Sequence, residues 1–203
     1  DIVARKGNRV TATDQVFVDD VLIVNKAKPI YIALNKPIGI VCTTDARDPD
    51  NIITYLGYKE RMFPIGRLDK MSQGLILLTN DGDIVNKILR AGNYHEKEYI
   101  VTVNKPIDTA FIKTMSAGVP ILDTVTRPCQ VHKIDDYTFS IILTQGLNRQ
   151  IRRMCEFLGY QVKALSRIRI MDIKLDGIDY DTWRYLTDDE IARLMQMVKD
   201  SRK

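Results

Sequence analysis

Hydrophobic and polar positions along the chain follow two kinds of pattern. Short apolar runs, and short stretches in which apolar and polar residues alternate, are typical of β-strands, whereas apolar positions that recur every three to four residues are typical of helices. These patterns predict strands at residues 16–25, 31–35, 38–42, 74–79, 99–103, 126–132, 138–143, 162–165 and 168–175. They predict helices at residues 51–56, 81–89, 108–117 and 148–158. A last helix is predicted to begin at Thr187, which forms a capping box with Glu190.

The order of these elements indicates the fold class. Strands and helices mix without the regular β-α-β rhythm of a parallel doubly wound sheet. We therefore expect an α+β fold in which a mixed, mostly antiparallel central sheet is flanked by helices. With 203 residues, 45% of them hydrophobic, the chain is long enough to bury a core without disulfides or metals.

The composition also narrows the class of protein. No apolar run approaches the roughly 20 residues that a membrane-spanning helix needs, so no membrane association is expected. Cys42, Cys129 and Cys155 are scattered and form no Cys-x-x-Cys pair, which indicates a reducing, cytoplasmic compartment. Neither histidine has a second ligand at a suitable spacing, so we expect no metal site. No exposed apolar heptad is evident, and a monomer is expected.

Positive charge is concentrated in one segment. The net charge of the whole chain is only +4. Residues 145–170, however, hold six cationic side chains and a single anionic one, Glu156. A basic stripe on an otherwise near-neutral protein is typical of a surface that binds phosphate groups, although solvated helix faces can have the same composition.

The densest group of candidate functional residues lies in a loop bounded by Gly66 and Gly74. Asp69 stands in this loop between Arg67 and Lys70, directly before the apolar strand predicted at 74–79. Loops anchored to a rigid strand often carry functional groups, and neighbouring cations keep a carboxylate ionised. Such a carboxylate can act as a nucleophile or a base. From the residue types alone, however, an aspartate between two cations is better explained as part of a surface salt bridge than as a catalytic group.

The basic segment supplies candidate partners for this carboxylate. Arg149, Arg152 and Arg153 are spaced i, i+3 and i+4, which would place them on one face of the helix predicted at 148–158. From there they could address both a phosphate and a carboxylate. Tyr99 lies within a predicted strand, where a tyrosine is most often part of the core and can otherwise offer a stacking surface for a base.

Several spaced motifs resemble those of RNA pseudouridine synthases of the small-subunit (RsuA) type. The motifs run from residue 31 to about residue 194 and occur in the family's order. They are Leu34-Asn-Lys-Pro37, Gly66-Arg-Leu-Asp69-Lys70 with Ser72-x-Gly74-Leu75, Leu77-Leu-Thr-Asn80-Asp-Gly82, Lys97-Glu98-Tyr99, Gly146-Leu-Asn-Arg149-Gln-Ile-Arg152-Arg-Met154 and Lys163-x-Leu165-x-Arg167. The sequence around His95–Tyr99 and Gly146–Arg149 is most similar to that of members that act on large-subunit ribosomal RNA.

The resemblance implies an activity that needs no cofactor. A uridine in ribosomal RNA, expected to be 23S RNA, would be flipped out and isomerised to pseudouridine: the N-glycosidic bond breaks, the uracil turns, and C5 rejoins the ribose. Asp69 would attack the ribose C1′ or the uracil C6, or remove the C2′ proton. The resemblance further implies that Tyr99 stacks against the uracil and that Arg152 orients Asp69.

The same resemblance assigns the RNA-binding residues. Arg67 would fill the gap left by the flipped base, because a planar cation can stack there and offset part of the cost of unstacking. Leu165 would line the uracil pocket. The remaining RNA contacts are expected from Lys70, Arg149, Arg153, Lys163 and Arg167. Lys36 is expected either at a surface turn or in contact with RNA.

Two domains are expected. Residues 1–26 resemble the last part of an S4 RNA-binding domain, with Gly7, Arg9, Asp14 and Asn25 in the expected order, and residues 27–203 would form the catalytic domain. The first residues lack a basic segment followed by an apolar run, so no secretory signal is expected. Because the first residue is Asp1, we expect the chain to start inside a longer sequence.

Three alternatives stay open at this point. The same chemistry could act on 16S ribosomal RNA or on a transfer RNA. A non-catalytic RNA-binding assembly factor would have the same fold, but a degenerate copy is expected to lose Asp69, Tyr99 or Arg152, and all three are present. A uracil-handling glycosidase would need a second carboxylate as general acid. Asp81 and Asp83 are the candidates, although they are better explained as the start of a helix.

Overall fold

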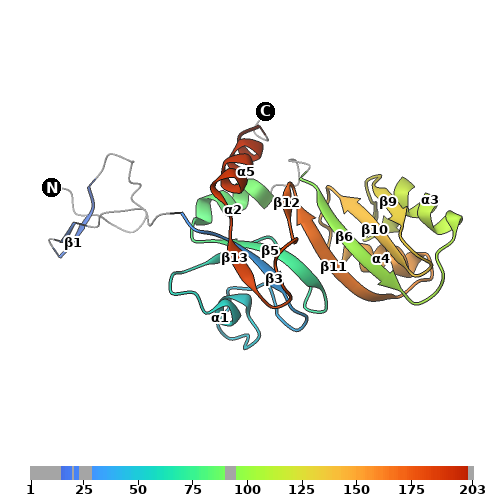
Figure 1. Cartoon of the computed structure of the whole chain (residues 1–203), viewed down its shortest axis with the longest axis horizontal. Coiled ribbons are helices and arrows are strands. Elements are labelled where there is room, and N and C mark those ends of the chain that lie inside the picture. The colour runs from blue at the N-terminus through green and yellow to red at the C-terminus, as the bar shows by residue number, and fades with distance from the viewer. Residues whose placement is uncertain (1–14, 20, 23–28, 90–94, 201–203) are drawn as a thin grey trace.

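The computed structural model describes residues 15–19, 21–22, 29–89 and 95–200 (Figure 1). The helices are α1 (Ile52–Leu56), α2 (Gly82–Leu89), α3 (Thr109–Ala117), α4 (Gln150–Phe157) and α5 (Asp188–Asp200). The strands are β1 (Phe17–Val18), β2 (Val21–Leu22), β3 (Tyr31–Lys36), β4 (Phe63–Ile65), β5 (Gln73–Thr79), β6 (Lys97–Val103), β7 (Pro120–Ile121), β8 (Thr124–Val125), β9 (Gln130–Lys133), β10 (Thr138–Leu143), β11 (Val162–Ile170), β12 (Ile173–Lys174) and β13 (Trp183–Tyr185).

One large sheet organises the described part of the chain. Its strand order is β13-β3-β5-β11-β6-β10-β9, with β4 added beside β5 and β12 beside β11. The pairing of β5 with β11 is parallel, and the other pairings in this sheet are antiparallel. The expected α+β fold with a mixed, mostly antiparallel sheet is therefore confirmed. The parallel pair joins the two halves of the sheet, which lie on opposite sides in Figure 1.

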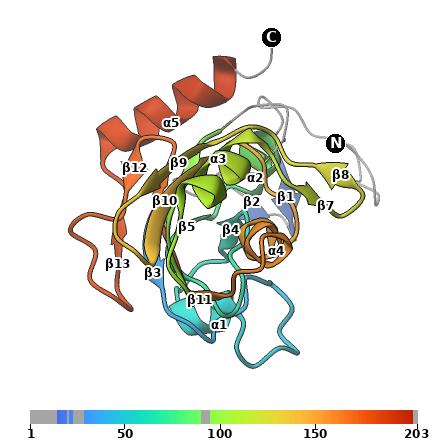
Figure 2. The same cartoon turned by 90° about the vertical axis from the view of Figure 1, so that its right-hand side faces the viewer.

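The two halves of the sheet are buried differently. Every residue of β3 is buried because helices and loops cover both of its faces, and β5 is buried over nearly its whole length. In β6 and β10, by contrast, every second residue is buried, as expected for antiparallel strands with one face in solvent. One core cluster packs against α3 and α4, and a second packs against α2 and α5. Figure 2 shows α4 and α5 on opposite sides of the sheet.

All five predicted helices are confirmed, together with the residues that begin three of them. Asn51 and Asp108 each accept a hydrogen bond from a backbone N–H of the first turn, of α1 and α3 respectively. In the predicted capping box, Thr187 Oγ1 accepts from the Glu190 N–H at 3.2 Å, and Glu190 Oε2 accepts from the Thr187 N–H at 2.9 Å. Local side-chain chemistry therefore sets where these helices start.

The strand predictions fail in some places. Residues 38–42 form a turn, in which only Val41 makes a bridge, to Asn51. Pro37 lacks an N–H and Gly39 has a φ of +99°, so this segment cannot continue the ladder. The two strands predicted at 162–165 and 168–175 are one continuous strand, β11, followed by a turn at Met171 and the short β12. The pattern also missed β4, β7, β8 and β13.

The N-terminal element is described only in part. Phe17 pairs with Leu22 in a short β1–β2 hairpin. The remainder of the S4-like segment predicted at 1–26 lies mostly outside the described residues. Among the helices that the structure describes, none is both long and apolar enough to cross a membrane.

Candidate active site

The loop that carries Asp69 is fixed by backbone contacts on both sides. It connects β4 to β5, and within it the Ser72 N–H donates to the Asp69 carbonyl at 3.0 Å. From outside the loop, the Gly39 N–H donates to the Lys70 carbonyl at 2.8 Å. The turn that follows β3 therefore helps to hold the residues around Asp69 in place.

Gly74 lets β11 come close to this loop. Gly74 pairs with Arg167 in the parallel β5–β11 contact and has a φ of +105°. A Cβ atom at this position would lie 2.3 Å from the Arg167 carbonyl oxygen and 2.7 Å from its nitrogen. Only a residue without a side chain fits both the backbone conformation and the close approach.

Arg152, in the first turn of α4, reaches across to the Asp69 loop. Its Nη2 donates to the Met71 carbonyl at 2.8 Å and to Ser72 Oγ at 3.1 Å. Its Nε lies 3.9 Å from Asp69 Oδ2, in a pair whose side chains are 12% and 34% exposed. Burial and the charge of Arg149 lower the pKa of Arg152, whereas Asp69 acts in the opposite direction. The guanidinium is therefore held by neutral acceptors while it faces the carboxylate.

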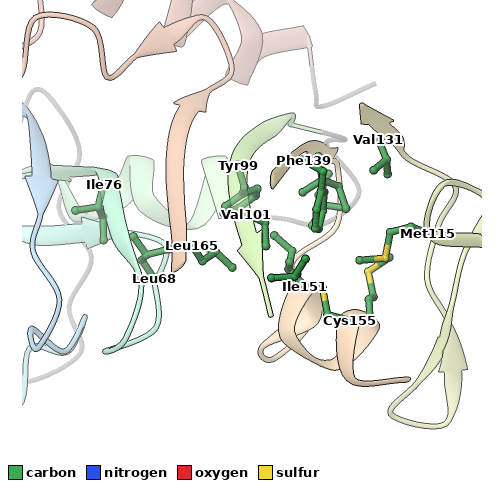
Figure 3. Close-up of a cluster of buried hydrophobic side chains, with 14 of the residues drawn as sticks. Leu68, Ile76, Tyr99, Val101, Met115, Val131, Phe139, Ile151, Cys155 and Leu165 are labelled. Atoms are coloured by element: carbon green, nitrogen blue, oxygen red, sulfur yellow. The ribbon is translucent and has the colours of Figure 1, made fainter. Parts of the chain in front are cut away.

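Tyr99 and Leu165 come from neighbouring strands and are both buried. In the β6–β11 register Tyr99 lies opposite Arg167, and Val101 lies opposite Leu165. The Arg167 Cζ atom is 6.0 Å from the centre of the Tyr99 ring. Figure 3 shows Tyr99 and Leu165 among the side chains that continue the core from Ile76 toward Phe139.

These elements enclose a cleft of about 1070 Å³. Eight of the ten residues predicted for the site line it: Arg67, Asp69, Lys70, Tyr99, Arg149, Arg152, Leu165 and Arg167. The other two lie outside its lining. Arg153 donates to the Asn148 carbonyl and side chain, and Lys163 is exposed on β11.

Asp69 is the one carboxylate among the described residues that line the cleft. Asp81 and Asp83, which the glycosidase alternative would need as general acid, lie at the start of α2 instead. There Asp81 Oδ1 accepts from the Asp83 N–H at 3.2 Å. The described cleft therefore lacks the pair of carboxylates on which glycoside hydrolysis depends.

Arg167 has a different place from the one that a phosphate contact implies. It is 3% exposed, its Nε donates to the Leu75 carbonyl at 2.7 Å, and its Nη1 donates to the Arg67 carbonyl at 3.2 Å. Arg167 therefore holds the backbone on both sides of Asp69, at Arg67 and at Leu75. Arg169, two residues later, would normally share its face, but a bulge between them turns Arg169 to the other side, where it binds glutamates.

Sequence reasoning gave the wrong position for Lys36 and overlooked Lys97. Lys36 is neither at a surface turn nor free to contact RNA. It is fully buried, and its Nζ donates to the carbonyls of Pro37 at 2.8 Å and Ile40 at 2.9 Å. Burial lowers its pKa to about 8. The apolar run Tyr31–Leu34, which ends directly before Asn35 and Lys36, was the available signal of burial. Lys97 lines the cleft, and its position two residues before Tyr99 could have indicated this.

Comparison with known proteins agrees with this geometry. The family model described as RNA pseudouridylate synthase matches residues 30–157. The chain is 57% identical to the dual-specificity RNA pseudouridine synthase RluF of Escherichia coli K12, over 96% of this chain and 70% of that protein. It is 30% identical to the ribosomal large subunit pseudouridine synthase B of Bacillus subtilis, over 95% of this chain and 82% of that protein.

A solved structure gives the same result for the fold. The crystal structure of a pseudouridylate synthase superposes with a TM-score of 0.76 and 29% sequence identity, over 92% of this chain and 83% of that one. The family match covers more than half of the chain, and it includes the Asp69 loop, Tyr99 and Arg152. The chain therefore belongs to the RNA pseudouridine synthase family and is an RNA-modifying isomerase.

Proposed function

We propose that this isomerase converts a uridine of 23S ribosomal RNA to pseudouridine, with Asp69 as the reacting carboxylate. The observation that carries the proposal is the pair formed by Asp69 and Arg152. Asp69 is the only carboxylate among the described cleft residues, and a guanidinium held by neutral acceptors lies 3.9 Å from it. A nearby positive charge attracts and orients a carboxylate, and a nucleophile or a base must be oriented toward the atom it attacks.

The reaction redistributes bonds within one nucleotide. The bond between the ribose C1′ and the uracil N1 breaks, the uracil turns, a bond forms between C1′ and C5, and the C5 proton leaves while N1 gains one. No oxidant or reductant is consumed. Asp69 either forms a covalent bond at C1′ or C6, or takes the C2′ proton. A single carboxylate suffices for each of these routes.

The other cleft residues bind and orient the nucleotide. Tyr99 and Leu165 form the apolar wall against which the uracil lies, and Arg152 orients Asp69. The exposed Arg67 enters the RNA and stacks in the gap left by the flipped base, because a planar guanidinium can replace part of the lost stacking. Arg167 acts through the backbone of Arg67 as a positioning residue.

Phosphate contacts surround this centre. Arg149 is exposed at the rim of the cleft, and Lys70 is exposed beside Asp69, where Asp50 pairs with it at 2.7 Å. Arg153 and Lys163 extend the positive surface beyond the cleft lining. Electrostatic contacts of this kind supply affinity without reading sequence.

The choice of 23S RNA rests on the relatives. A large subunit pseudouridine synthase is 30% identical, but so is a ribosomal small subunit pseudouridine synthase of Haemophilus influenzae. The name of the 57% identical relative includes dual specificity, which favours a second RNA substrate. For that second substrate we propose a transfer RNA, the alternative left open by the sequence. We further propose a monomeric, cytoplasmic protein in which residues 27–203 catalyse and residues 1–26 belong to an S4 module.

The experiment that tests the proposal is pseudouridine mapping on defined RNAs. Purified protein is incubated with unmodified 23S, 16S and transfer RNA transcripts, and each is mapped at nucleotide resolution. Conversion of a discrete uridine in 23S RNA is expected. Conversion confined to 16S RNA or to transfer RNA would contradict the 23S assignment, and no conversion in any of the three would contradict the proposed activity.

A further inference from the structure

Lys97 is a cation of the cleft that has no role in the mechanism above. It is the first residue of β6 and stands two positions before Tyr99, so both side chains leave the strand on the same face, about 7 Å apart along it. Both residues line the cleft, and so do Leu143 and Ile170, the register partners of Lys97. Lys97 therefore lies beside the wall that Tyr99 forms.

The acidic residues nearby do not neutralise Lys97. Glu96 and Glu98 both bind the Arg169 guanidinium, at 3.1 and 2.8 Å. Asp69 is paired with Arg152. The Nζ atom of Lys97 donates to the His95 carbonyl at 3.1 Å, a partner that carries no charge. Within the described part of the chain, Lys97 forms no salt bridge.

A second cation, Arg167, makes the partly buried position of the Lys97 charge less favourable. Arg167 lies across the β6–β11 pair, opposite Tyr99. Burial and the charge of Arg167 together lower the pKa of Lys97 to about 8. At neutral pH most of the lysine is still protonated, so two neighbouring positive charges share a partly buried place. Such charges cost free energy unless an anion accompanies them.

We propose that Lys97 binds a phosphodiester oxygen of the RNA next to the uridine that enters the cleft. The inference rests on the proposed function, because it takes Tyr99 as the wall for the uracil. Uracil is neutral, whereas the RNA backbone brings one negative charge per nucleotide. The phosphate is therefore the anion that the substrate supplies, and a lysine ammonium binds it as a point charge.

Three variants test this contact. Lys97→Met removes the charge, Lys97→Arg keeps it, and Lys113→Met removes the same charge from an exposed position on α3 outside the cleft lining. The affinity of each for a synthetic 23S RNA stem-loop with the mapped uridine is measured over a range of salt concentrations. Lys97→Met should weaken binding about tenfold and reduce the slope of log affinity against log salt by about 0.7–0.9. Lys97→Arg should restore the slope, and Lys113→Met should change neither quantity.

Thermal unfolding separates binding from a structural role. Because Lys97→Met removes a charge that Arg167 repels, the free protein should unfold at the same temperature as the wild type or a higher one. A lower unfolding temperature combined with an unchanged salt slope would overturn the proposal and make Lys97 a structural residue.

Neutral phosphate analogues locate the contact on the RNA. Stem-loops with a methylphosphonate at either phosphate flanking the target uridine should bind the wild type about tenfold more weakly at one of the two positions, and Lys97→Met should be insensitive at that position. Equal sensitivity of both proteins would overturn the phosphate contact without affecting Asp69. Conversion retained in Asp69→Asn would instead contradict the proposed function, so the two failures are distinguishable.

Discussion

Gly74 shows how one residue without a side chain determines the geometry of the site. It joins β5 to the loop that carries Asp69, and it faces the backbone of Arg167 more closely than any Cβ atom would allow. Lys36 also determines part of this geometry, in its case through a long buried side chain. Its buried ammonium holds the 37–40 turn, and that turn donates a backbone hydrogen bond to Lys70. Neither residue touches the reacting nucleotide in the proposed mechanism.

Replacing Gly74 by alanine should destabilise the protein strongly. The new Cβ would clash with the Arg167 backbone, and the positive φ adds strain, so we expect a loss of about 3 kcal/mol or more in the free energy of unfolding. Denaturant unfolding of the wild type and the variant measures this loss. Gly177→Ala is the matched control, because Gly177 has a φ of +74° but no atom within 4 Å of the added Cβ. Equal losses in both variants would contradict the close-contact explanation.

The buried Lys36 predicts a pH dependence of stability. Its pKa is lowered from 10.5 to about 8 in the folded protein. Above pH 8 the folded state therefore binds fewer protons than the unfolded state, and the contribution of Lys36 to stability rises with pH until about 10.5. Below pH 8 both states are protonated and the contribution is constant at its lowest value.

Comparison with Lys36→Met isolates this effect, because the other titrating groups are shared. The free energy of unfolding of the wild type minus that of Lys36→Met should be flat below pH 7 and should increase between pH 8 and 10. Lys113→Met, which removes a lysine from an exposed position on α3, is the matched control. A difference for Lys36 that falls over this range would contradict the buried, charged position.

At the scale of elements, α4 illustrates what the sequence could and could not predict. The helix itself was predicted because its periodicity and its end at Gly159 are local signals. The expectation that Arg149, Arg152 and Arg153 share one face was only partly right. Arg149 precedes the helix in a left-handed conformation, Arg153 turns back to Asn148, and only Arg152 reaches the Asp69 loop.

Long-range pairing explains the remaining differences. The parallel β5–β11 contact, the addition of β13 to β3 and the bulge after Arg167 all depend on residues about 70 to 150 positions apart. Nothing in a local pattern shows that Arg167 and Arg169 point to opposite faces. Asp69, Tyr99 and Arg152 were found because they stand in spaced motifs, whereas Lys36 and Lys97 needed the assembled cleft to show their surroundings.

The position of Arg152 on α4 gives a kinetic prediction. Arg152→Ala should lower the single-turnover rate at saturating RNA by about 100-fold or more, because Asp69 loses the charge that orients it. Arg153→Ala, on the same helix but outside the cleft lining, should weaken RNA affinity and leave the saturated rate close to that of the wild type. If Arg152→Ala changed only the affinity, α4 would be a binding surface and nothing more.

At the scale of the whole molecule, the cleft lies where the two halves of the sheet meet. The half with β3 and β5 is covered on both faces and carries the Asp69 loop, and the half with β6 and β10 carries Tyr99 on its one buried face. The parallel β5–β11 pair connects the two halves, and α4 places Arg152 next to Asp69. A rigid frame on both sides of the cleft suits a reaction in which one nucleotide must be held while its base turns.

Release of tritium from RNA labelled at C5 of uridine tests the central claim most directly, because joining C5 to the ribose expels the hydrogen at that position. The wild type should release tritium from the mapped uridine in a single turnover. Asp69→Asn should reduce that rate by about 1,000-fold or more while its affinity for the same RNA stays within about twofold, since one carboxylate makes no phosphate contact. An Asp69→Asn protein that releases tritium at a rate near that of the wild type would contradict the account.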